Sequence, residues 1–419
     1  GPAASLCGAH ALTGLEEAVV VDMGGTTSDV ALLRGGRPVA SATGAVVGAH
    51  RTVVRAPAIR TSGLGGDSHI RVEREGRVAV GPRRVLPLSR LAAERPGIPG
   101  LLRELAEANL AELRLLQPCE LYVHVREVPE ALHGLNDLER GILRVLRDGP
   151  ASLLTLSRAL DYPYLSCLPV ARLEDRGLIL RAGLTPTDLL HVDGSFDRWD
   201  TDTARLALEL VADRAEVTPD ELAARARAAM REHLVRALAG AAMGLDDRLA
   251  ADRPEDALER LVQSAAHGRP DGAVTCRLGL TLPVIGIGAP AGALVPDAAD
   301  ALGAEAVVPA RAGVAGAVGA ITGSVVQRVQ LLVRPDMAQG GFVLHAPDQT
   351  RTFARLEAAK EFARTHATDL VRRQALAAGA GRFHIRVHVE DRQGKAREGG
   401  FVYIETRITA EAAGAPKVR

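Results

Sequence analysis

Residues 19 to 33, VVVDMGGTTSDVALL, hold the residue types best suited to binding a phosphate group. Gly24 and Gly25 tolerate positive φ and have no Cβ, so backbone N–H groups can turn inward here and approach a phosphate closely. Thr26 and Thr27 add hydroxyl donors to the same concavity. Because these donors come from the backbone and from hydroxyl groups, such a loop needs no lysine. The stretch therefore predicts a phosphate-binding loop.

Two aspartates flank this loop. Asp22 follows a run of β-branched residues typical of a buried strand. It is a candidate magnesium ligand, acting through the ion's water molecules because magnesium loses its hydration shell reluctantly. Asp29 can hydrogen-bond the turn and fix its shape. The alternative is a β-hairpin with a glycine turn, which is the prediction for Gly35 and Gly36. The full string D-x-G-G-T-T-x-D after a buried strand favours the phosphate loop.

A second glycine-rich segment, TSGLGGDSH, spans residues 61 to 69. Its glycines predict a flexible turn surrounded by hydroxyl, carboxylate and imidazole groups. His69 begins an alternating strand, so the alternative to a functional role is that it faces solvent. The candidate site residues in this segment are Gly65, Gly66, Asp67 and Ser68.

Two later segments are further candidates. In TPTDLLHVDG, residues 185 to 194, Asp188 is either a site carboxylate or part of a helix cap, and His191 is spaced to form a polar pair with it. In GIGAPAG, residues 286 to 292, a strand end opens a helix through small residues, so a purine and a ribose can approach the backbone. The alternative for this second segment is a tight packing turn.

The surrounding pattern predicts the elements that position these segments. Residues 18 to 90 indicate short strands joined by tight turns. Helices are predicted over 101–116, 201–213, 218–240, 254–266 and 350–378, strands over 119–128 and in a pair near the C-terminus, and strand-turn-helix units over 282–303 and 304–323. This alternation of sheet and helix predicts an α/β fold. His384 and His388 share a strand face but lie too far along the chain from the loops to predict a metal site.

Residues 135 to 183 predict three helices and a short strand, an order that resembles a winged helix. In the would-be recognition helix, Arg172 and Arg176 are opposed by Glu174 and Asp175. Nucleic-acid binding takes most of its affinity from phosphate neutralisation, so this balance favours an inserted packing module.

Composition sets the wider limits. The 419 residues predict two or three domains, and 51 basic and 51 acidic residues give no global field that attracts nucleic acid or a membrane. The only lysines are Lys360, Lys395 and Lys417, which excludes a G-x-x-x-x-G-K loop. The four cysteines form no C-x-x-C pair, and the sequence shows no membrane span or signal peptide, so we expect a cytoplasmic protein.

Together these segments resemble the hydantoinase A/5-oxoprolinase family of the actin-like ATPase superfamily. The resemblance rests on GAHALTGLEEAVVVDMGGTTSDVALLRGGRPV, on IRTSGLGGDSHIRVEREGRVAVGPR, on LTPTDLLHVDGSFDRWDTDTA and on the two late glycine-rich stretches. It spans nearly the whole chain and is strongest at residues 1–90 and 184–325. The family pattern commonly has glycine at the position of Asp67, so Asp67 is expected to mark a subgroup with a different substrate or metal.

The resemblance implies an actin-like, ribonuclease H-like ATPase lobe with a winged-helix-like insertion and a C-terminal α+β segment. The expected segments are 1–92, 93–134, 135–183, 184–272, 273–334 and 335–419. Family members usually begin with another lobe of roughly 200 residues that carries a first phosphate loop. We therefore expect this chain to lack that lobe and to be inactive without it.

The resemblance also implies the roles of the candidate residues. ATP and Mg²⁺ are the expected cofactors, and the expected reaction opens a small cyclic amide of the hydantoin or 5-oxoproline type through phosphoryl activation of the carbonyl oxygen. The alternatives are a ketone carboxylase-type subunit and a non-catalytic nucleotide-binding module. Expected partners are the small substrate, a hydantoinase B-like subunit and a second copy of the chain, with no nucleic acid or membrane. The implied site comprises Asp22, Asp67 and Asp188 as catalytic residues, Asp22 as metal ligand, Gly24, Gly25, Thr26, Thr27, Asp29, Gly286, Gly288, Ala289 and Gly292 around the nucleotide, and Gly65, Gly66 and Ser68 near the substrate.

Overall fold

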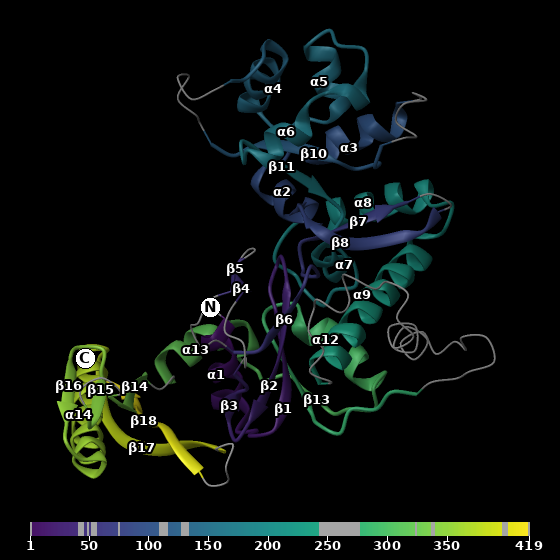
Figure 1. Ribbon diagram of the computed structural model, residues 1–419. Coiled ribbons are helices and arrows are strands. Elements are labelled where there is room, and N and C mark those ends of the chain that lie inside the picture. The colour runs from purple at the N-terminus through teal and green to yellow at the C-terminus, as the bar shows by residue number, and fades with distance from the viewer. Residues whose placement is uncertain are drawn as a thin grey trace. The chain divides into compact units, whose positions relative to one another are not determined.

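A computed structural model describes the chain as two compact units, Gly1–Gly316 and Ala317–Arg419, called unit 1 and unit 2 below (Figure 1). The described residues are 2–40, 46–47, 50–51, 57–73, 76–108, 116–126, 134–242, 277–322, 325–336, 340–395 and 401–417. Helices and several sheets are mixed along the chain, which confirms the predicted α/β class.

Unit 1 is built on a mixed sheet with β1 near its centre. β1 runs antiparallel to β2 and parallel to β12. Asp22, near the end of β1, therefore lies opposite Asp29 on one side and Ile287 on the other. The strands follow the order β13 (Ala306–Val307), β12 (Val284–Ile287), β1 (Ala18–Met23), β2 (Ser28–Arg34) and β3 (Arg37–Pro38), with β6 (Ile59–Ser62) also paired to β2. The first two predicted strands, the turn at Gly35 and Gly36, and the strand that leads into GIGAPAG are confirmed.

Both faces of this sheet are covered, which explains the unbroken apolar run in β1. Val20 packs into a cluster with α1 (Pro2–Thr13), whereas Val19 and Val21 face the larger core of unit 1. That larger core includes α9 (Pro219–Ala242) and α12 (Ala291–Asp300). Alternate side chains of one strand thus hold helices on opposite faces.

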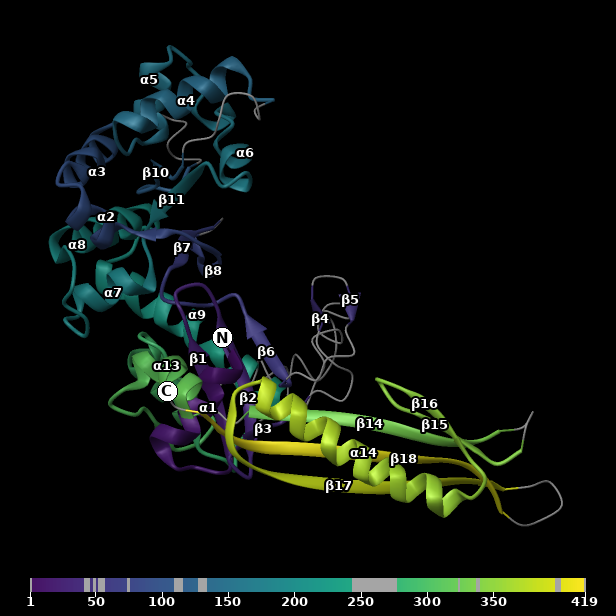
Figure 2. The same cartoon turned by 90° about the vertical axis from the view of Figure 1, so that its left-hand side faces the viewer.

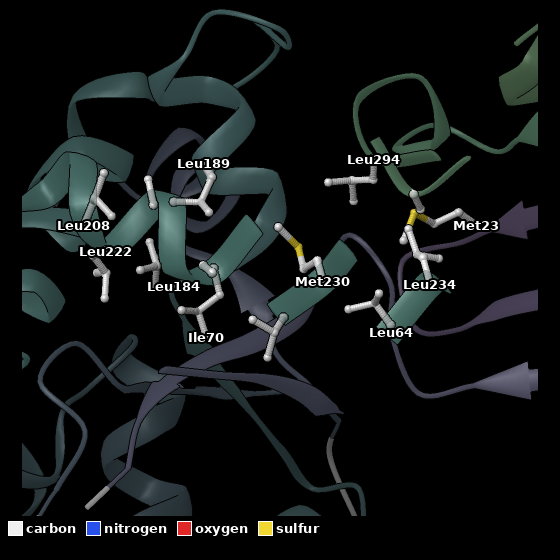
Figure 3. Close-up of a cluster of buried hydrophobic side chains, with 14 of the residues drawn as sticks. Met23, Leu64, Ile70, Leu184, Leu189, Leu208, Leu222, Met230, Leu234 and Leu294 are labelled. Atoms are coloured by element: carbon white, nitrogen blue, oxygen red, sulfur yellow. The ribbon is translucent and has the colours of Figure 1, made fainter. Parts of the chain in front are cut away.

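The larger core continues under the predicted site loops. Figure 3 shows Met23, at the end of β1, close to Leu64, Leu234 and Leu294. Leu64 is the apolar residue inside TSGLGGDSH, and it is fully buried. A buried leucine between flexible glycines fixes that loop against the end of the sheet.

Further elements of unit 1 surround this core. They are β7 (Ser68–Val72), β8 (Val78–Arg84), β9 (Leu86–Pro87), α2 (Leu88–Glu94), α3 (Ile98–Glu107), β10 (Leu121–His124), α7 (Pro186–Val192) and α8 (Thr201–Arg214), with short β4 (Val46–Val47) and β5 (His50–Arg51). The boundary between the two units falls within α13 (Ala315–Thr322). The predicted helices over 201–213 and 218–240 are confirmed by α8 and α9. The predicted helix over 254–266 lies outside the described residues, as do residues 109–115 of the helix predicted from 101.

The segment predicted as three helices and a strand contains α4 (Asp137–Asp148), α5 (Leu153–Ala159), α6 (Val170–Asp175) and β11 (Ile179–Gly183). Asn136 caps α4 in a reciprocal capping box with Glu139. These elements have an apolar cluster of their own. Arg172 pairs with Glu139, so one arginine of the would-be recognition helix is engaged within the module. The predicted element order is confirmed, and the winged-helix likeness stays an interpretation.

Unit 2 is an antiparallel sheet with one long helix on one face (Figure 2). Ile408, Ala410 and Ala412 of the sheet share a core with the helix alanines Ala359 and Ala363. The strand order is β16 (Thr350–Phe353), β15 (Phe342–His345), β14 (Val325–Pro335), β18 (Phe401–Pro416) and β17 (Ala380–Lys395), and the helix is α14 (Leu356–Ala377). The predicted strand pair is confirmed, and the predicted helix is confirmed from Leu356 onward. The start of that prediction, residues 350–353, is wrong because these residues form β16, and β14 and β15 were not predicted.

Two expectations about the whole chain concern membranes and metals. Among the described residues, no helix combines the length and apolar character that a bilayer span requires. The same residues bring together no group of three or more histidine, cysteine, aspartate or glutamate side chains that could hold a metal ion. Exposed His384 and His388 of β17 accordingly stay outside any such group.

Candidate phosphate-binding site

The first glycine loop turns sharply between β1 and β2. The Gly24 N–H donates to the Thr27 carbonyl oxygen at 2.9 Å, which closes the turn. Within the described part of the chain, the N–H groups of Gly25, Thr26 and Thr27 have no hydrogen-bond partner, and neither do the two threonine hydroxyls. Thr26 is exposed and Thr27 half-buried. The loop therefore presents several donors with nothing in the described chain to satisfy them, as an anion site requires.

Two carboxylates stand at the base of this loop on neighbouring strands. Asp22 lies directly opposite Asp29 in the antiparallel β1–β2 pair, so the two side chains share one sheet face. Burial raises the pKa of the Asp22 carboxyl, a hydrogen bond with Ser5 opposes this, and the negative Asp29 raises the pKa further. Asp29 accepts a hydrogen bond from the Thr61 hydroxyl at 2.6 Å. A cation beside Asp22 would offset the repulsion between the two carboxylates.

The second glycine loop packs directly on the first. The Gly66 N–H donates to the Gly24 carbonyl oxygen at 3.0 Å, and the Asp67 N–H donates to that of Gly25 at 2.7 Å. A Cβ on Gly65 would lie 2.5 Å from the Gly25 oxygen. The two loops, about forty residues apart in sequence, thus form one backbone structure.

Ser68 contributes to the second loop from inside. It is buried, and its hydroxyl accepts a hydrogen bond from the Gly65 N–H at 2.8 Å. Ser28 completes the connection, because its hydroxyl donates to the Leu64 carbonyl oxygen at 2.6 Å. The contacts of Ser68 fix the shape of the loop, and its predicted contact with substrate stays a prediction.

The start of α7 holds the second loop from the other side. Both the N–H and the hydroxyl of Thr187 donate to the Gly66 carbonyl oxygen, at 2.9 and 2.7 Å. A Cβ on Gly66 would lie 2.9 Å from the Thr187 hydroxyl and 3.6 Å from the Pro290 ring. The segments containing residues 22–29, 61–69, 185–194 and 286–292 therefore converge at one place in unit 1.

Asp188, next to Thr187 in α7, is fully buried. It forms a capping box with Thr185, whose N–H and hydroxyl donate to it at 2.9 and 2.8 Å. The Ser89 N–H donates to the same carboxylate at 2.8 Å. Burial raises the pKa of Asp188, and the donors from Ser89 and Thr185 oppose that shift. The contacts of Asp188 are those of a cap, and its predicted catalytic role stays a prediction.

His191 makes contacts other than the polar pair expected with Asp188. Its Nδ1 lies 2.8 Å from the Thr187 carbonyl oxygen, and its Nε2 accepts from the Trp199 N–H at 3.1 Å. The imidazole also stacks on the Trp199 ring, with centroids 5.5 Å apart. His191 therefore links α7 to the segment before α8.

The glycine-rich end of β12 contains both close backbone contacts and exposed small residues. Gly288 has φ +95°, and a Cβ there would lie 2.0 Å from the Met23 carbonyl oxygen, so only glycine fits beside β1. Gly286 is buried, and a Cβ there would press on Val295 and Val308 at 3.2 Å, which is the packing alternative raised from the sequence. Ala289 and Gly292 are exposed and remain open to a ligand.

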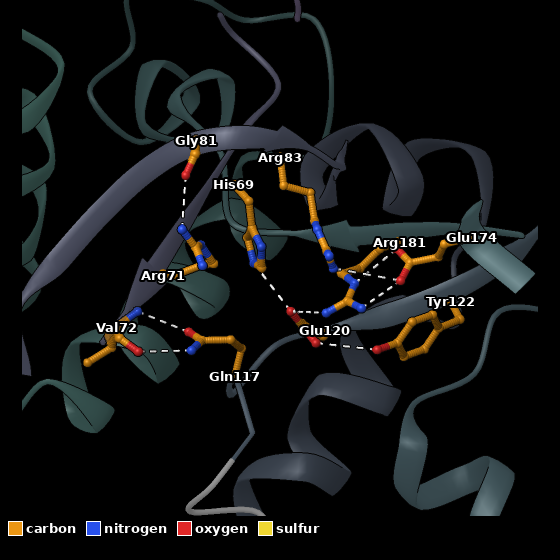
Figure 4. Close-up of polar contacts among 10 residues, drawn as sticks. All are labelled: His69, Arg71, Val72, Gly81, Arg83, Gln117, Glu120, Tyr122, Glu174 and Arg181. Atoms are coloured by element: carbon orange, nitrogen blue, oxygen red, sulfur yellow. Dashed lines mark hydrogen bonds and ion pairs between the residues drawn. The ribbon is translucent and has the colours of Figure 1, made fainter. Parts of the chain in front are cut away.

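His69 lies away from solvent, so the solvent-facing alternative is wrong. Its side chain is 1% exposed, its Nε2 is 3.7 Å from a Glu120 oxygen, and its Nδ1 has no partner among the described residues (Figure 4). Burial, followed by the positive charges of Arg181 and Arg71, lowers the pKa of His69 to about 3. The imidazole is therefore neutral near pH 7.

A buried ionic cluster beside His69 was not found from the sequence. Arg181 donates to Glu120 at 2.6 Å and to both oxygens of Glu174 at 3.1 and 2.6 Å (Figure 4). The Tyr122 ring lies 5.2 Å from the guanidinium carbon and directly opposite Arg181 across the β10–β11 pair. The hydroxyl of Tyr122 reaches Glu120 at 3.4 Å. The only sequence signal was charged residues inside otherwise apolar strands.

Comparison with known proteins places the first part of the chain. Residues 1–98 match the family model described as hydantoinase/oxoprolinase, which confirms the resemblance predicted from the sequence. This segment contains both glycine loops. No curated protein sequence matches the chain significantly.

Two solved structures are also similar to this chain. One is nucleotide-free acetone carboxylase, at 12% identity and a TM-score of 0.46, covering 99% of this chain and 49% of that one. The other is the ATP-dependent caprolactamase from Pseudomonas jessenii, at 14% identity and a TM-score of 0.46, covering 100% of this chain and 50% of that one. The chain thus spans about half the length of either protein.

Proposed function

We propose that the loop over residues 22–29 binds the phosphates of magnesium-bound ATP in an enzyme that opens a small cyclic amide. The observation that carries this proposal is the set of unpartnered N–H groups at Gly25, Thr26 and Thr27, within the described chain, next to the carboxylate of Asp22. The hydantoinase/oxoprolinase match over the same residues supports a cyclic amide as the substrate class.

Separate residues would bind the phosphates, the magnesium ion and the adenosine of ATP. The three N–H groups would donate to phosphate oxygens, and the Thr26 and Thr27 hydroxyls would add further donors. Asp22 would hold the magnesium ion through water, with Asp29 kept in place by Thr61. ATP, when bound, supplies the phosphoryl group that turns the amide carbonyl into a better electrophile. Ala289 follows β12 and Gly292 lies in the first turn of α12; both are exposed, and the adenosine would lie against them.

The test is the variant Asp22→Ala in the full-length protein, with Asp202→Ala as control. Asp202 is 92% exposed in the first turn of α8. We expect Asp22→Ala to lower magnesium-dependent ATP turnover by roughly a hundredfold or more with the unfolding temperature retained, because the ion would lose its anchor. Asp202→Ala should match the parent. Near-normal turnover by Asp22→Ala would refute the assignment.

A substrate panel distinguishes the alternative activities. ATP turnover stimulated by cyclic amides supports the hydrolase, and turnover stimulated only by ketones with bicarbonate supports the carboxylase type instead. Turnover that no member of either panel changes, with a hydantoinase B-like partner supplied, supports a nucleotide-binding module. Size measurement of the purified complex tests the predicted partner and the predicted self-association.

A further inference from the structure

Asp67 lies against Gly25 of the phosphate loop with both its backbone and its side chain. Its N–H donates to the Gly25 carbonyl oxygen at 2.7 Å, and its Oδ2 would lie 2.6 Å from a Cβ built on Gly25. The Asp67 side chain is only 16% exposed. Burial raises the pKa of this carboxyl, and the positive Arg84 opposes the shift. Asp67 therefore packs against the same backbone that presents the unpartnered donors.

Arg84 is held beside this loop by the carboxylate of Asp67. Its Nε and Nη2 both donate to Asp67 Oδ2, at 3.1 and 3.0 Å. The β7–β8 pairing places Arg84 opposite Ser68, and the Val85 N–H donates to the Asp67 carbonyl oxygen at 2.9 Å. Among the described residues, the second terminal nitrogen of Arg84, Nη1, has no partner, and the side chain is 57% exposed. A guanidinium with two nitrogens anchored and one free is oriented rather than mobile.

An arginine beside the proposed phosphate loop would add a positive charge that the loop itself lacks. The donors of the loop are backbone N–H groups and hydroxyls, which carry no full positive charge, whereas a terminal phosphoryl group carries about two negative charges near pH 7. The residues of unit 1 include no lysine, because all three lysines lie in unit 2. Arginine binds phosphate oxygens with charge-assisted hydrogen bonds and suits this task.

We propose that Arg84 binds the γ-phosphoryl group of ATP, and that Asp67 is a positioning residue that aims the Arg84 guanidinium. This inference rests on the proposed function, and it replaces the predicted catalytic role of Asp67 with support for Arg84.

The experiment compares binding of ATP and ADP in the presence of magnesium, by calorimetry on the full-length protein. Arg84→Gln should weaken ATP binding by roughly ten- to a hundredfold and leave ADP binding within about twofold, because only ATP has the group that Arg84 contacts. Arg84→Lys keeps a positive charge and should retain part of the preference for ATP. Asp67→Asn should shift the ATP-to-ADP ratio in the same direction as Arg84→Gln, by a smaller factor.

Arg83→Gln is the matched control. Arg83 is the neighbouring residue in β8, 51% exposed, and its guanidinium lies 3.7 Å from Glu174, near the cluster drawn in Figure 4. Successive strand residues face opposite ways, so this variant should leave the ATP-to-ADP ratio unchanged.

The outcomes separate this inference from the proposed function. A parent protein that binds neither nucleotide overturns the proposed function itself. A parent that binds both, with an unchanged ATP-to-ADP ratio in Arg84→Gln, overturns only the role of Arg84. Equal losses of ATP and ADP binding in Arg84→Gln also overturn it, because the residue would then support the fold or another part of the nucleotide.

Discussion

Individual glycines set the shape of the proposed phosphate site. Gly65 lies so close to the first loop that a Cβ would meet the carbonyl oxygens of Gly25 and Gly24 at 2.5 and 2.7 Å. These are backbone atoms and cannot swing aside as a flexible side chain would. The two loops can therefore stay in register only while residue 65 has no side chain.

The variant Gly65→Ala adds one methyl group and so tests whether residue 65 must lack a side chain. We expect the free energy of unfolding to fall by about 1–3 kcal/mol, because the loops must move apart. Nucleotide binding should weaken by roughly tenfold, because the displaced loop no longer aims its donors. Chemical denaturation and calorimetry measure the two effects. Gly100→Ala in α3, where nothing lies within 4 Å of the new methyl group, is the control. A Gly65→Ala variant that binds nucleotide as tightly as Gly100→Ala would contradict the proposed loop geometry.

The chemistry of each glycine loop could be predicted from the sequence, but the contact between the loops could not. Local spacing in D-x-G-G-T-T-x-D predicted the donors and the carboxylates. Asp67 was singled out as a difference from the family pattern, and Arg84 was not singled out at all. Arg84 becomes visible only once the β7–β8 register places it opposite Ser68.

At the scale of elements, one carboxylate joins two helices. Asp188 completes the capping box of α7 and also accepts from the N–H groups of Leu88 and Ser89, at 3.3 and 2.8 Å. Those two residues begin α2, whose own N-cap, Pro87, offers no side-chain hydrogen bond. A buried acceptor thus satisfies buried N–H donors at the starts of two helices.

Asp188→Asn should therefore destabilise the protein by about 2–4 kcal/mol, since an amide group presents its own N–H donors to a site lined with donors. Thermal and chemical unfolding measure this. Asp202→Asn, at an exposed position in the first turn of α8, should change the stability by less than about 0.5 kcal/mol. Were Asp188 catalytic, Asp188→Asn would instead lose ATP turnover with an unchanged unfolding temperature, and that result would overturn the capping role.

The elements themselves were predicted where the periodicity was long and clear. The apolar run of β1 and the amphipathic patterns of α8 and α9 were sufficient to predict these three elements. The hairpin strands β15 and β16 have four residues each, too few for an alternating pattern to stand out, and the eleven-residue strand β14 was also missed. The capping signal at Thr185 and Asp188 was also visible, but its second partner is about a hundred residues earlier in the chain and gave no local signal.

At the scale of the whole molecule, each unit has its own apolar core. Unit 2 encloses the cluster between its sheet and α14, whereas unit 1 holds the glycine loops, the larger core and the buried ions. Length and composition predicted more than one domain, and the contact boundary falls after Gly316. The six segments expected from the sequence remain an interpretation, because shifts of composition do not show which segments share a core.

Burial of His69, with the positive charges of Arg181 and Arg71 near it, makes the stability of unit 1 depend on pH. The folded state lowers the pKa of this imidazole from 6.5 to about 3, so folding favours the neutral form. Its stabilising contribution is fully present above about pH 6.5 and is lost as the pH falls toward 3, because the unfolded chain binds the proton first. Between those values His69 should make the free energy of unfolding fall by up to about 1.4 kcal/mol for each pH unit lost.

His69→Gln should remove this slope. The measurement is the free energy of unfolding at several values between pH 7 and pH 4.5, followed by the fluorescence of Trp199, the only tryptophan, which reports on unit 1. We expect the parent to lose stability faster than the variant as the pH falls, because a glutamine does not titrate. His384→Gln, at an exposed position of β17 in unit 2, should keep the slope of the parent. If His69→Gln and the parent lose stability in parallel, His69 does not stay neutral in the folded protein, and the buried cluster around Glu120 must supply it with a counter-charge.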